Sequence, residues 1–391
     1  MIVFTYPGQG SQKPGMGEPW HDHPSWELVA EASEAAGRDV EALLLSADAD
    51  ELKQTRNAQL STFVLSMVVL DAITRVGVDA AGHAGHSLGE YSALTASGAL
   101  DFADAVRLVA ERGEAMQVAA EDREGTMAAV LGLDDEQVEI ACARVGGDVW
   151  VANYNAPGQV VVAGSPDAVQ EAGRIAKELG GKRLMPLPVS GAFHTPFMAP
   201  ARDRLRKAID QIEIRDPQGV VVANVDAAAH DDAGDWQSLL NAQLCSPVRW
   251  RQTLHTLADL GFTTFVEVGP GTVLTGMAKR TIAQARTLSV GTADELDRML
   301  EALAGPPAAS LGQIEGEHLY VRERIIVSPG AGVFRPEAGL EAGSPLDAGQ
   351  VVGHVGSLEV RSPFAGQLMG FLAVETERVT SSEPIAWLTT A

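Results

Sequence analysis

The chain is poor in cysteine and in basic residues, and each shortage excludes a class of protein. Only Cys142 and Cys245 are present among 391 residues, far apart and without CxxC spacing, so we expect buried free thiols rather than a disulfide or a metal site. Lysine and arginine number 29 against 52 acidic residues, a formal net charge of −23. Because phosphates are bound by clustered basic side chains, this charge argues against a nucleic acid or an anionic membrane as partner.

Long apolar runs are missing too. The chain starts with MIVFTYP, which resembles a strand and lacks the basic region and apolar core of a signal peptide. Nowhere do about 18 apolar residues follow one another, as a membrane-spanning helix requires. The sequence therefore predicts a cytoplasmic protein. Its balance of apolar, charged and Gly/Pro residues is typical of a globular enzyme.

Strand-like and helix-like segments alternate through most of the chain. Short apolar runs such as 2–6 predict strands, and helical periodicity predicts helices over 59–75 and 101–121. This alternation indicates an α/β fold with a mainly parallel, hydrolase-like sheet. We expect that core to comprise residues 1–124 and 190–303.

Between residues 125 and 189 the pattern changes to MAAVLGL, a helix, WVANYN, GQVVVAGS, a second helix and RLMPLPV. That order predicts an inserted α+β subdomain of ferredoxin-like type. Two adjacent prolines among small residues then predict an exposed linker over 304–313.

The tail, residues 314–391, repeats itself. The segment SPGAG at 328–332 matches SPFAG at 362–366 at an offset of 34, and the same offset superimposes Val351 on Ile385 without a gap. Each copy is too small to bury its own apolar side, so the two halves must interleave in one small all-β barrel-sandwich domain.

A candidate nucleophile lies in the segment GHSLG at 85–89. It follows an apolar strand and opens a helical stretch, the context of a nucleophile elbow that holds Ser87 on a strained turn. GxSxG also arises by chance in many chains, so the motif alone does not decide between a catalytic serine and a chance match.

A serine hydroxyl needs a base, and His194 is the best placed of the histidines. It lies in GAFHTP, after an apolar strand and just before a helix, where a side chain can project into a cleft. A loop histidine that packs or caps is the alternative. His86 is adjacent to the serine, but neighbours on a sharp turn point apart, so we interpret it as a supporting residue.

An inward-facing arginine follows from helical spacing. Phe102, Ala105, Val109 and Met116 recur on one face of the helix predicted from residue 101, and Arg112 falls on that face. A buried arginine must be paired, either with a structural carboxylate or with the carboxylate of a ligand. The spacing leaves both open.

Acyl transfer also needs hydrogen-bond donors for the developing oxyanion. The backbone N–H of Leu88, directly after the serine, supplies one. The loop PGQGSQ at 7–12 offers others, although an ordinary β-to-α turn explains it equally well.

Seven segments in order support one assignment: YPGQGSQ, GHSLGEYSAL, the ERG of 111–113, NYNAPGQVVVAG, GAFHTP, LCSPVRW and EVGPGTVLTGM. Together they resemble the malonyl-CoA:acyl carrier protein transacylase family. The resemblance implies a malonyl ester on the serine, with malonyl-CoA and an acyl carrier protein as partners in fatty acid or polyketide synthesis, and neither metal nor cofactor. It implies the following roles: Ser87 as nucleophile, His194 as general base, Gln243 as the residue whose main-chain carbonyl orients the histidine, Gln9 and Leu88 as oxyanion donors, and Arg112 as partner of the malonyl carboxylate.

Two further expectations follow from the resemblance. Phe193 gives an AFH sequence, which in related acyltransferases accompanies malonyl rather than methylmalonyl selection. An acidic carrier requires a local basic patch on this acidic chain, for which the candidates are Lys182 with Arg183, or Arg202, Arg204, Arg206 and Lys207.

The tail resembles biotinyl/lipoyl-type domains. In that family a lysine at a hairpin tip carries the prosthetic group, but residues 311–391 contain no lysine. We therefore expect no attached cofactor.

Three alternatives stay open. A serine esterase or thioesterase shares the GxSxG elbow, and a related transferase would use another acyl-CoA such as methylmalonyl-CoA. A non-catalytic scaffold, in which the tail acts and the first domain is a relic, is the third.

Overall fold

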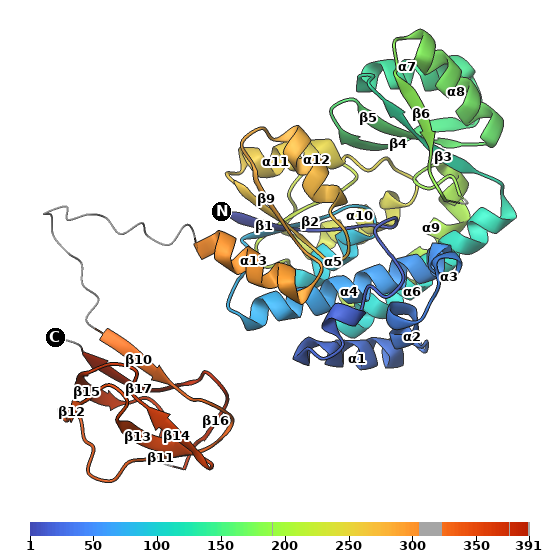
Figure 1. Ribbon diagram of the computed structural model, residues 1–391. Helices are drawn as coiled ribbons and strands as arrows, with labels where there is room; N and C mark the ends of the chain where they lie inside the picture. The colour runs from blue at the N-terminus through green and yellow to red at the C-terminus, as the bar shows by residue number, and fades with distance from the viewer. Residues whose placement is uncertain (190, 305–322, 375, 390–391) are drawn as a thin grey trace, which may run out of the picture. The chain divides into compact units, whose positions relative to one another are not determined.

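The computed structural model describes residues 1–189, 191–304, 323–374 and 376–389. They fall into two compact units, one within Met1–Pro307 and one within Ala308–Ala391 (Figure 1). Most of the predicted linker, from residue 305 onward, lies outside the described residues.

The first unit is built on a five-stranded parallel sheet with the order β7-β2-β1-β8-β9. Its strands are β1 (Ile2–Tyr6), β2 (Gly82–Gly85), β7 (Val220–Val222), β8 (Thr264–Val268) and β9 (Arg286–Val290). The central strands β1, β2 and β8 are almost wholly buried, as in parallel sheets covered on both faces. The predicted α/β core with a parallel sheet is confirmed.

Helices cover this sheet, with α11 and α12 above it and α4 and α6 below it in Figure 1. The helices of the core are α1 (Glu27–Ala36), α2 (Val40–Leu45), α3 (Ala49–Lys53), α4 (Thr55–Arg75), α5 (Gly89–Ala96), α6 (Phe102–Asp122), α9 (Ala199–Ile209), α10 (Ala233–Gln243), α11 (Trp250–Asp259), α12 (Val273–Thr281) and α13 (Ala293–Ala304). Short 3₁₀ helices occupy Glu18–Trp20, Pro24–Trp26 and Pro196–Met198.

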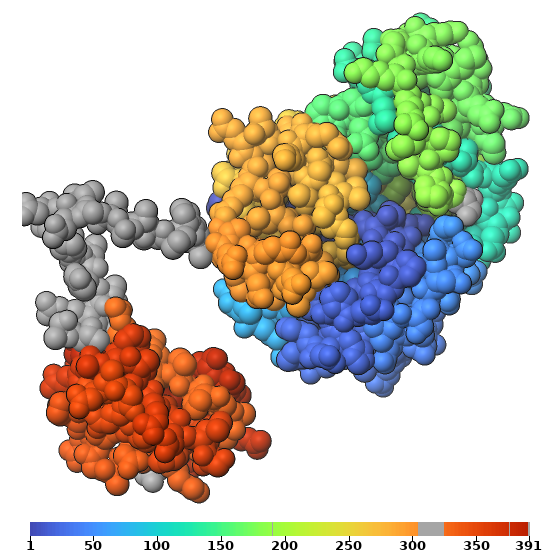
Figure 2. All heavy atoms as spheres, in the orientation of Figure 1, coloured from blue at the N-terminus to red at the C-terminus, as the bar shows by residue number. Residues whose placement is uncertain are grey.

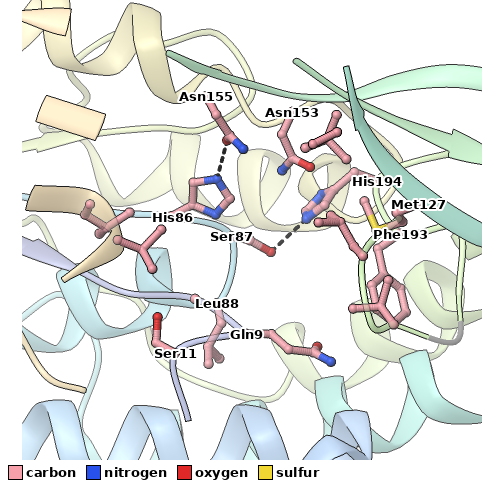
Figure 3. Close-up of a pocket in the computed structure, with 18 of the residues that line it drawn as sticks. Gln9, Ser11, His86, Ser87, Leu88, Met127, Asn153, Asn155, Phe193 and His194 are labelled. Carbon is pink, nitrogen blue, oxygen red and sulfur yellow. Dashed lines mark hydrogen bonds between the residues drawn. The ribbon is translucent and has the colours of Figure 1, made fainter. Parts of the chain in front are cut away.

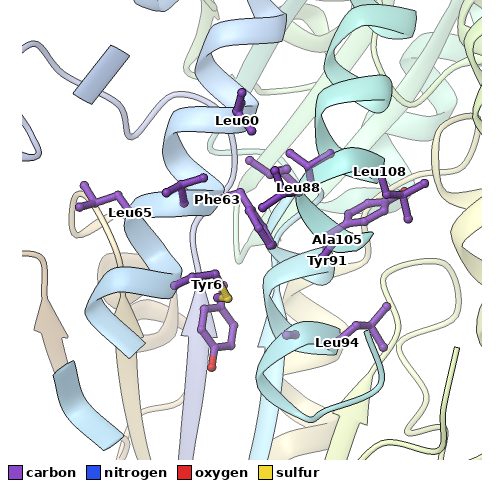
Figure 4. Close-up of a cluster of buried hydrophobic side chains, with 14 of the residues drawn as sticks. Tyr6, Leu60, Phe63, Leu65, Leu88, Tyr91, Leu94, Ala105 and Leu108 are labelled. Atoms are coloured by element: carbon purple, nitrogen blue, oxygen red, sulfur yellow. The ribbon is translucent and has the colours of Figure 1, made fainter. Parts of the chain in front are cut away.

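Helix α4 runs through the main apolar core, where its Leu60 and Phe63 lie near Leu88 and Tyr91 of the elbow region (Figure 4). By length and composition α4 could cross a membrane, but 83% of its most apolar window is buried inside the unit, as in the core helix of a soluble protein. The helix begins at Thr55, four residues before the predicted start. Polar residues interrupt the apolar pattern there, so the sequence did not predict this first turn. The Thr55 N–H donates to the Gln117 side chain at 2.8 Å, which satisfies one backbone donor at the start of the helix.

The inserted segment folds around a second sheet, of order β4-β5-β3-β6. Its elements follow one another as β3 (Thr126–Leu131), α7 (Asp135–Val145), β4 (Val149–Ala156), β5 (Gln159–Gly164), α8 (Pro166–Glu178) and β6 (Arg183–Pro186). All neighbouring strands are antiparallel. Alanine and valine side chains of β3, β4, β5 and both helices form most of a separate small core. Figure 2 shows this green segment standing on the blue and orange surface of the parallel-sheet core.

The second unit consists of two four-stranded sheets, with the orders β10-β17-β15-β12 and β14-β13-β11-β16. The strands are β10 (Glu323–Val327), β11 (Gly332–Pro336), β12 (Pro345–Leu346), β13 (Val351–Val355), β14 (Leu358–Arg361), β15 (Gly366–Phe371), β16 (Arg378–Val379) and β17 (Pro384–Thr389). Strands β10 to β13 belong to the first repeat and β14 to β17 to the second, so each sheet takes strands from both. The predicted interleaving is confirmed.

Equivalent turns relate the two repeats. The Ser328 hydroxyl donates to the Gly330 carbonyl at 2.5 Å, and the Ser362 hydroxyl donates to the Phe364 carbonyl at 2.7 Å. Both pairs keep the predicted offset of 34.

The gapless alignment of Val351 with Ile385 is wrong. The Asp347 N–H bonds the Gln350 side chain and the Thr380 N–H bonds the Glu383 side chain, which is an offset of 33. The residue of the first repeat that is equivalent to Ile385 is accordingly Val352, and both side chains are fully buried. The second repeat has one residue fewer between its turn and its last strands, so it needs a one-residue gap.

Candidate active site

Ser87 lies between the end of β2 and the start of α5, on a turn that requires glycine at positions 85 and 89. A Cβ atom on Gly85 would come within 1.8 Å of the Gly89 backbone, and one on Gly89 within 2.0 Å of the Tyr6 carbonyl oxygen. Ser87 itself has a positive φ of 53°, which is strained for a side chain other than glycine. The predicted strand, turn and helix context is confirmed.

His194 meets this serine from a distant segment. Its Nε2 lies 2.7 Å from Ser87 Oγ, and its Nδ1 lies 3.0 Å from the main-chain carbonyl of Gln243. Figure 3 shows the imidazole pointing at the hydroxyl. His194 also has a positive φ, 61°. The ring is therefore held by a main-chain carbonyl, and no carboxylate of the described residues contacts it.

The environment keeps His194 neutral. Burial, followed by the positive charge of Arg112, lowers the pKa of His194 to about 3. A neutral imidazole whose Nδ1–H donates to a carbonyl presents a free lone pair at Nε2. His194 can therefore accept the serine proton at neutral pH.

Arg112 projects from α6 into the same site and is 1% exposed. Its Nη1 donates to Gln59 Oε1 at 2.6 Å, and its Nη2 donates to Gln243 Oε1 at 2.9 Å and to Ser87 Oγ at 3.0 Å. Among the described residues no carboxylate lies within ion-pair distance of it. The inward direction is confirmed, and the structural ion pair is wrong: within the described residues, the hydrogen-bond partners of this buried cation are neutral.

Two backbone donors border the cavity beside the serine. Leu88 follows Ser87, and Gln9 approaches from the loop after β1. Within the described residues neither N–H donates a hydrogen bond. Both are therefore available to an oxygen atom near Ser87.

The cavity around these residues has a volume of about 230 Å³. Besides the residues above, it is lined by His86, Asn153, Asn155, Met127 and Phe193, together with apolar side chains of β6 and α12. The inserted segment thus forms one wall and the core the other. His86 Nε2 and Asn155 Oδ1 are 2.9 Å apart and join the two walls. The described residues contain no group of side chains suited to a metal ion.

Comparison with known proteins agrees with this geometry. The acyl transferase domain family matches residues 3–318. The malonyl CoA-acyl carrier protein transacylase of Bacillus subtilis is 40% identical over 307 residues, covering 77% of this chain and 97% of its own. The chain belongs to this transacylase family. The β unit, from Glu323, lies beyond the matched residues.

Two solved structures are similar. An acyl carrier protein S-malonyltransferase from Vibrio cholerae has a TM-score of 0.74 and 40% identity, covering 76% of this chain and 99% of its own. A malonyl-transacylase solved with its type II PKS acyl-carrier protein has a TM-score of 0.74 and 38% identity, covering 77% and 99%. This chain therefore matches nearly the whole length of both solved relatives.

Three residues of the transacylase site were not predicted from the sequence. Gln59 binds Arg112, as described above. Asn224 accepts a hydrogen bond from the Ser87 N–H at 2.7 Å and donates one to the Gly85 carbonyl at 2.7 Å. Glu90 is 1% exposed and contacts Asn224 and Gln243.

The two candidate basic patches of the transacylase differ. Arg202 pairs with Asp203, and Arg204 pairs with Glu111, so half of the α9 patch is already engaged. Lys182 and Arg183 make no ion pair with any described residue, and Arg183 lies in β6, whose Met185 lines the cavity.

Proposed function

We propose that this chain transfers malonyl from malonyl-CoA to the phosphopantetheine thiol of an acyl carrier protein through a malonyl ester on Ser87. The observation that carries the proposal is the convergence of Ser87, His194 and a buried arginine that has no carboxylate partner among the described residues. A nucleophile, a base and a cation hydrogen-bonded to neutral groups at one point suit an acyl group that carries its own negative charge.

In the first half reaction, Ser87 Oγ attacks the malonyl thioester carbon while its proton passes to His194 Nε2. The carbon–sulfur bond then breaks, and the coenzyme A thiolate takes the proton from His194. In the second half reaction the carrier thiol gives its proton to His194 and attacks the ester. The ester bond to Ser87 then breaks, and Ser87 Oγ takes that proton back from His194. The histidine thus acts as base and acid in turn.

The negative oxygen of each tetrahedral intermediate needs donors. The unengaged N–H groups of Leu88 and Gln9 are proposed for this role. Arg112 is proposed to bind the malonyl carboxylate through its guanidinium, whose N–H groups can form a bidentate pair with the two carboxylate oxygens. Gln243 is proposed to orient His194 through its carbonyl.

Phe193 lies in the cavity wall beside His194. We propose that its ring occupies the space that the extra methyl group of methylmalonyl would need. A transferase that prefers methylmalonyl-CoA is the alternative at this position.

The carrier protein is proposed as second substrate because a related malonyl-transacylase has been solved with its type II PKS acyl-carrier protein. Lys182 and Arg183, which make no ion pair with a described residue and precede the cavity residue Met185, are the favoured docking patch for an acidic carrier. Both fatty acid and polyketide synthesis use this chemistry.

The same proposal extends to the finer architecture. The βαββαβ order supports a ferredoxin-like subdomain over 125–189. The interleaved sheets support a biotinyl/lipoyl-like domain over 314–391, with core segments 1–124 and 190–303 and a linker at 304–313. A cytoplasmic location agrees with the burial of α4.

One experiment separates these readings. The purified protein is incubated with malonyl-, methylmalonyl- and acetyl-CoA, the covalent adduct is resolved by intact mass, and release to water is compared with release to a carrier thiol. A malonyl adduct that passes to the thiol is expected. Rapid release to water would favour the esterase, and absence of any adduct would favour the scaffold.

A further inference from the structure

Glu90 is a buried acid that the proposed reaction does not use. It lies in the first turn of α5, three residues after Ser87, and is 1% exposed. Burying an ionisable group without a function or a partner is costly. Its contacts therefore call for an explanation.

Each oxygen of Glu90 receives one hydrogen bond from a distant residue. The Asn224 N–H donates to Oε1 at 2.6 Å, and Gln243 Nε2 donates to Oε2 at 2.5 Å. Both partners also touch Ser87: Asn224 through the serine N–H, and Gln243 Nε2 through the serine carbonyl at 2.9 Å. Glu90 thus ties together the residues that surround the elbow.

The contact with Gln243 decides which way its amide faces. A carboxylate and a main-chain carbonyl only accept hydrogen bonds, so the NH₂ end must face Glu90 and Ser87. The oxygen end is left for the Arg112 guanidinium, which only donates, at 2.9 Å. The main-chain carbonyl of the same glutamine holds His194 at 3.0 Å.

The charge of Glu90 has a second effect. Burial raises the pKa of Glu90 to about 7, although the hydrogen bonds from Asn224 and Gln243 and the charge of Arg112 lower it. Burial lowers the pKa of Arg112, and the contacts with Tyr91, followed by the negative charge of Glu90, oppose that shift. Because Gln243 stands between them, the acid supports the cation without covering the donors that a ligand needs.

We infer that Glu90 is a positioning residue: through Gln243 it sets the Arg112 guanidinium to receive the carboxylate of the acyl group. This inference rests on the proposed function. Glutamine at position 90 would keep the bond from the Asn224 N–H, and its NH₂ would then face the NH₂ of Gln243. Relief of that conflict by a flip of Gln243 would turn a donor toward Arg112.

The test compares kcat/KM for acylation by malonyl-CoA and by acetyl-CoA in the full chain. Glu90→Gln should lower the malonyl-to-acetyl ratio at least about tenfold, because acetyl has no carboxylate for Arg112 to bind. In a Gln243→Ala background the same substitution should change the ratio by less than about twofold, since the relay is already broken.

Glu267→Gln is the matched control. Glu267 is also 1% exposed, but it accepts from the N–H groups of Leu274 and Thr275 at the start of α12. This variant should lose stability and keep the wild-type ratio. If Glu90→Gln does not fold, Glu90→Asp replaces it: the shorter side chain cannot reach both donors and should lower the ratio at least about threefold, again only when Gln243 is present.

An unchanged ratio in a folded Glu90 variant, or an equal effect with and without Gln243, would overturn the inference. A wild-type protein that forms no malonyl adduct would instead overturn the proposed function, so the two failures are distinguishable.

Discussion

Ser87 and His194 lie 107 positions apart in the sequence, yet their Oγ and Nε2 atoms are 2.7 Å apart and both residues have a positive φ. Each residue is held in this conformation by its surroundings: Ser87 by the glycine-flanked turn and the bond to Asn224, His194 by the Gln243 carbonyl. Two strained residues facing each other indicate a preorganised reaction centre.

Ser87→Ala should abolish the malonyl adduct, and His194→Ala should slow its formation by about three or more orders of magnitude, because either change removes most of the covalent route. Intact mass after rapid quenching measures both. A normal rate of malonyl uptake by the Ser87→Ala protein would refute the mechanism.

Arg112→Ala should lose malonyl transfer selectively and gain relative activity with acetyl-CoA. A buried charge-assisted pair with the free carboxylate contributes about 2–5 kcal/mol of discrimination. The matched control is Arg107→Ala on the same helix, whose side chain is 55% exposed and pairs with Asp104. Retained malonyl preference in the Arg112 variant would contradict the proposed role.

Acid should destabilise the wild-type protein through His194. Its pKa is about 3 when folded and about 6.5 when unfolded, so between these values only the unfolded chain binds the proton and stability falls as pH falls. His194→Gln removes this effect. The free energy of unfolding of the variant, measured relative to that of the wild type, should therefore rise by about 2 kcal/mol when the pH is lowered from 7 to 5.

Urea unfolding followed by helical circular dichroism measures that change, because the described part of the β unit contains no helix. Burial also lowers the pKa of His83, to about 4, but His83 is present in both proteins and cancels in the comparison. A difference between the two proteins that does not vary with pH would contradict the prediction.

Removal of the residues after Pro307 should leave malonyl transfer to a free carrier within about twofold of the full chain, because the described residues that line the cavity belong to the first unit. Turnover of both proteins with the same carrier measures this. Collapse of turnover in a truncated protein with intact circular dichroism would show that the β unit takes part in the reaction.

The β unit should carry neither biotin nor lipoate. The hairpin between β13 and β14 turns through Gly356 and Ser357, and no lysine occurs from residue 311 onward. Without an amine, no amide to the carboxyl group of either cofactor forms. Coexpression with the attaching ligase and intact mass should give the unmodified mass, and an added mass matching either cofactor would contradict the prediction.

The local part of the site was predictable from the sequence. Gly85, Ser87 and Leu88 are neighbours in one motif, and helical spacing alone turned Arg112 inward. The parallel sheet of the core and the interleaving of the tail likewise followed from alternation and repetition, which are local patterns.

The supporting residues were not predictable, because nothing local marks them. Asn224 lies 137 positions after the serine whose N–H it binds. Gln59 belongs to α4, a helix buried on nearly all sides, so no polar face singles it out. Glu90 was part of the family motif, but its partners are 134 and 153 positions away. Only the tertiary fold brings these groups together.

The exchange of strands in the β unit bears on its origin. Neither repeat owns a complete sheet, since each sheet needs strands from both. A single repeat would therefore have been stable only when associated with a second copy of itself. In this sense the β unit has the symmetry of a homodimer whose subunits have been fused into one polypeptide, and it can be inherited or transplanted only as a whole.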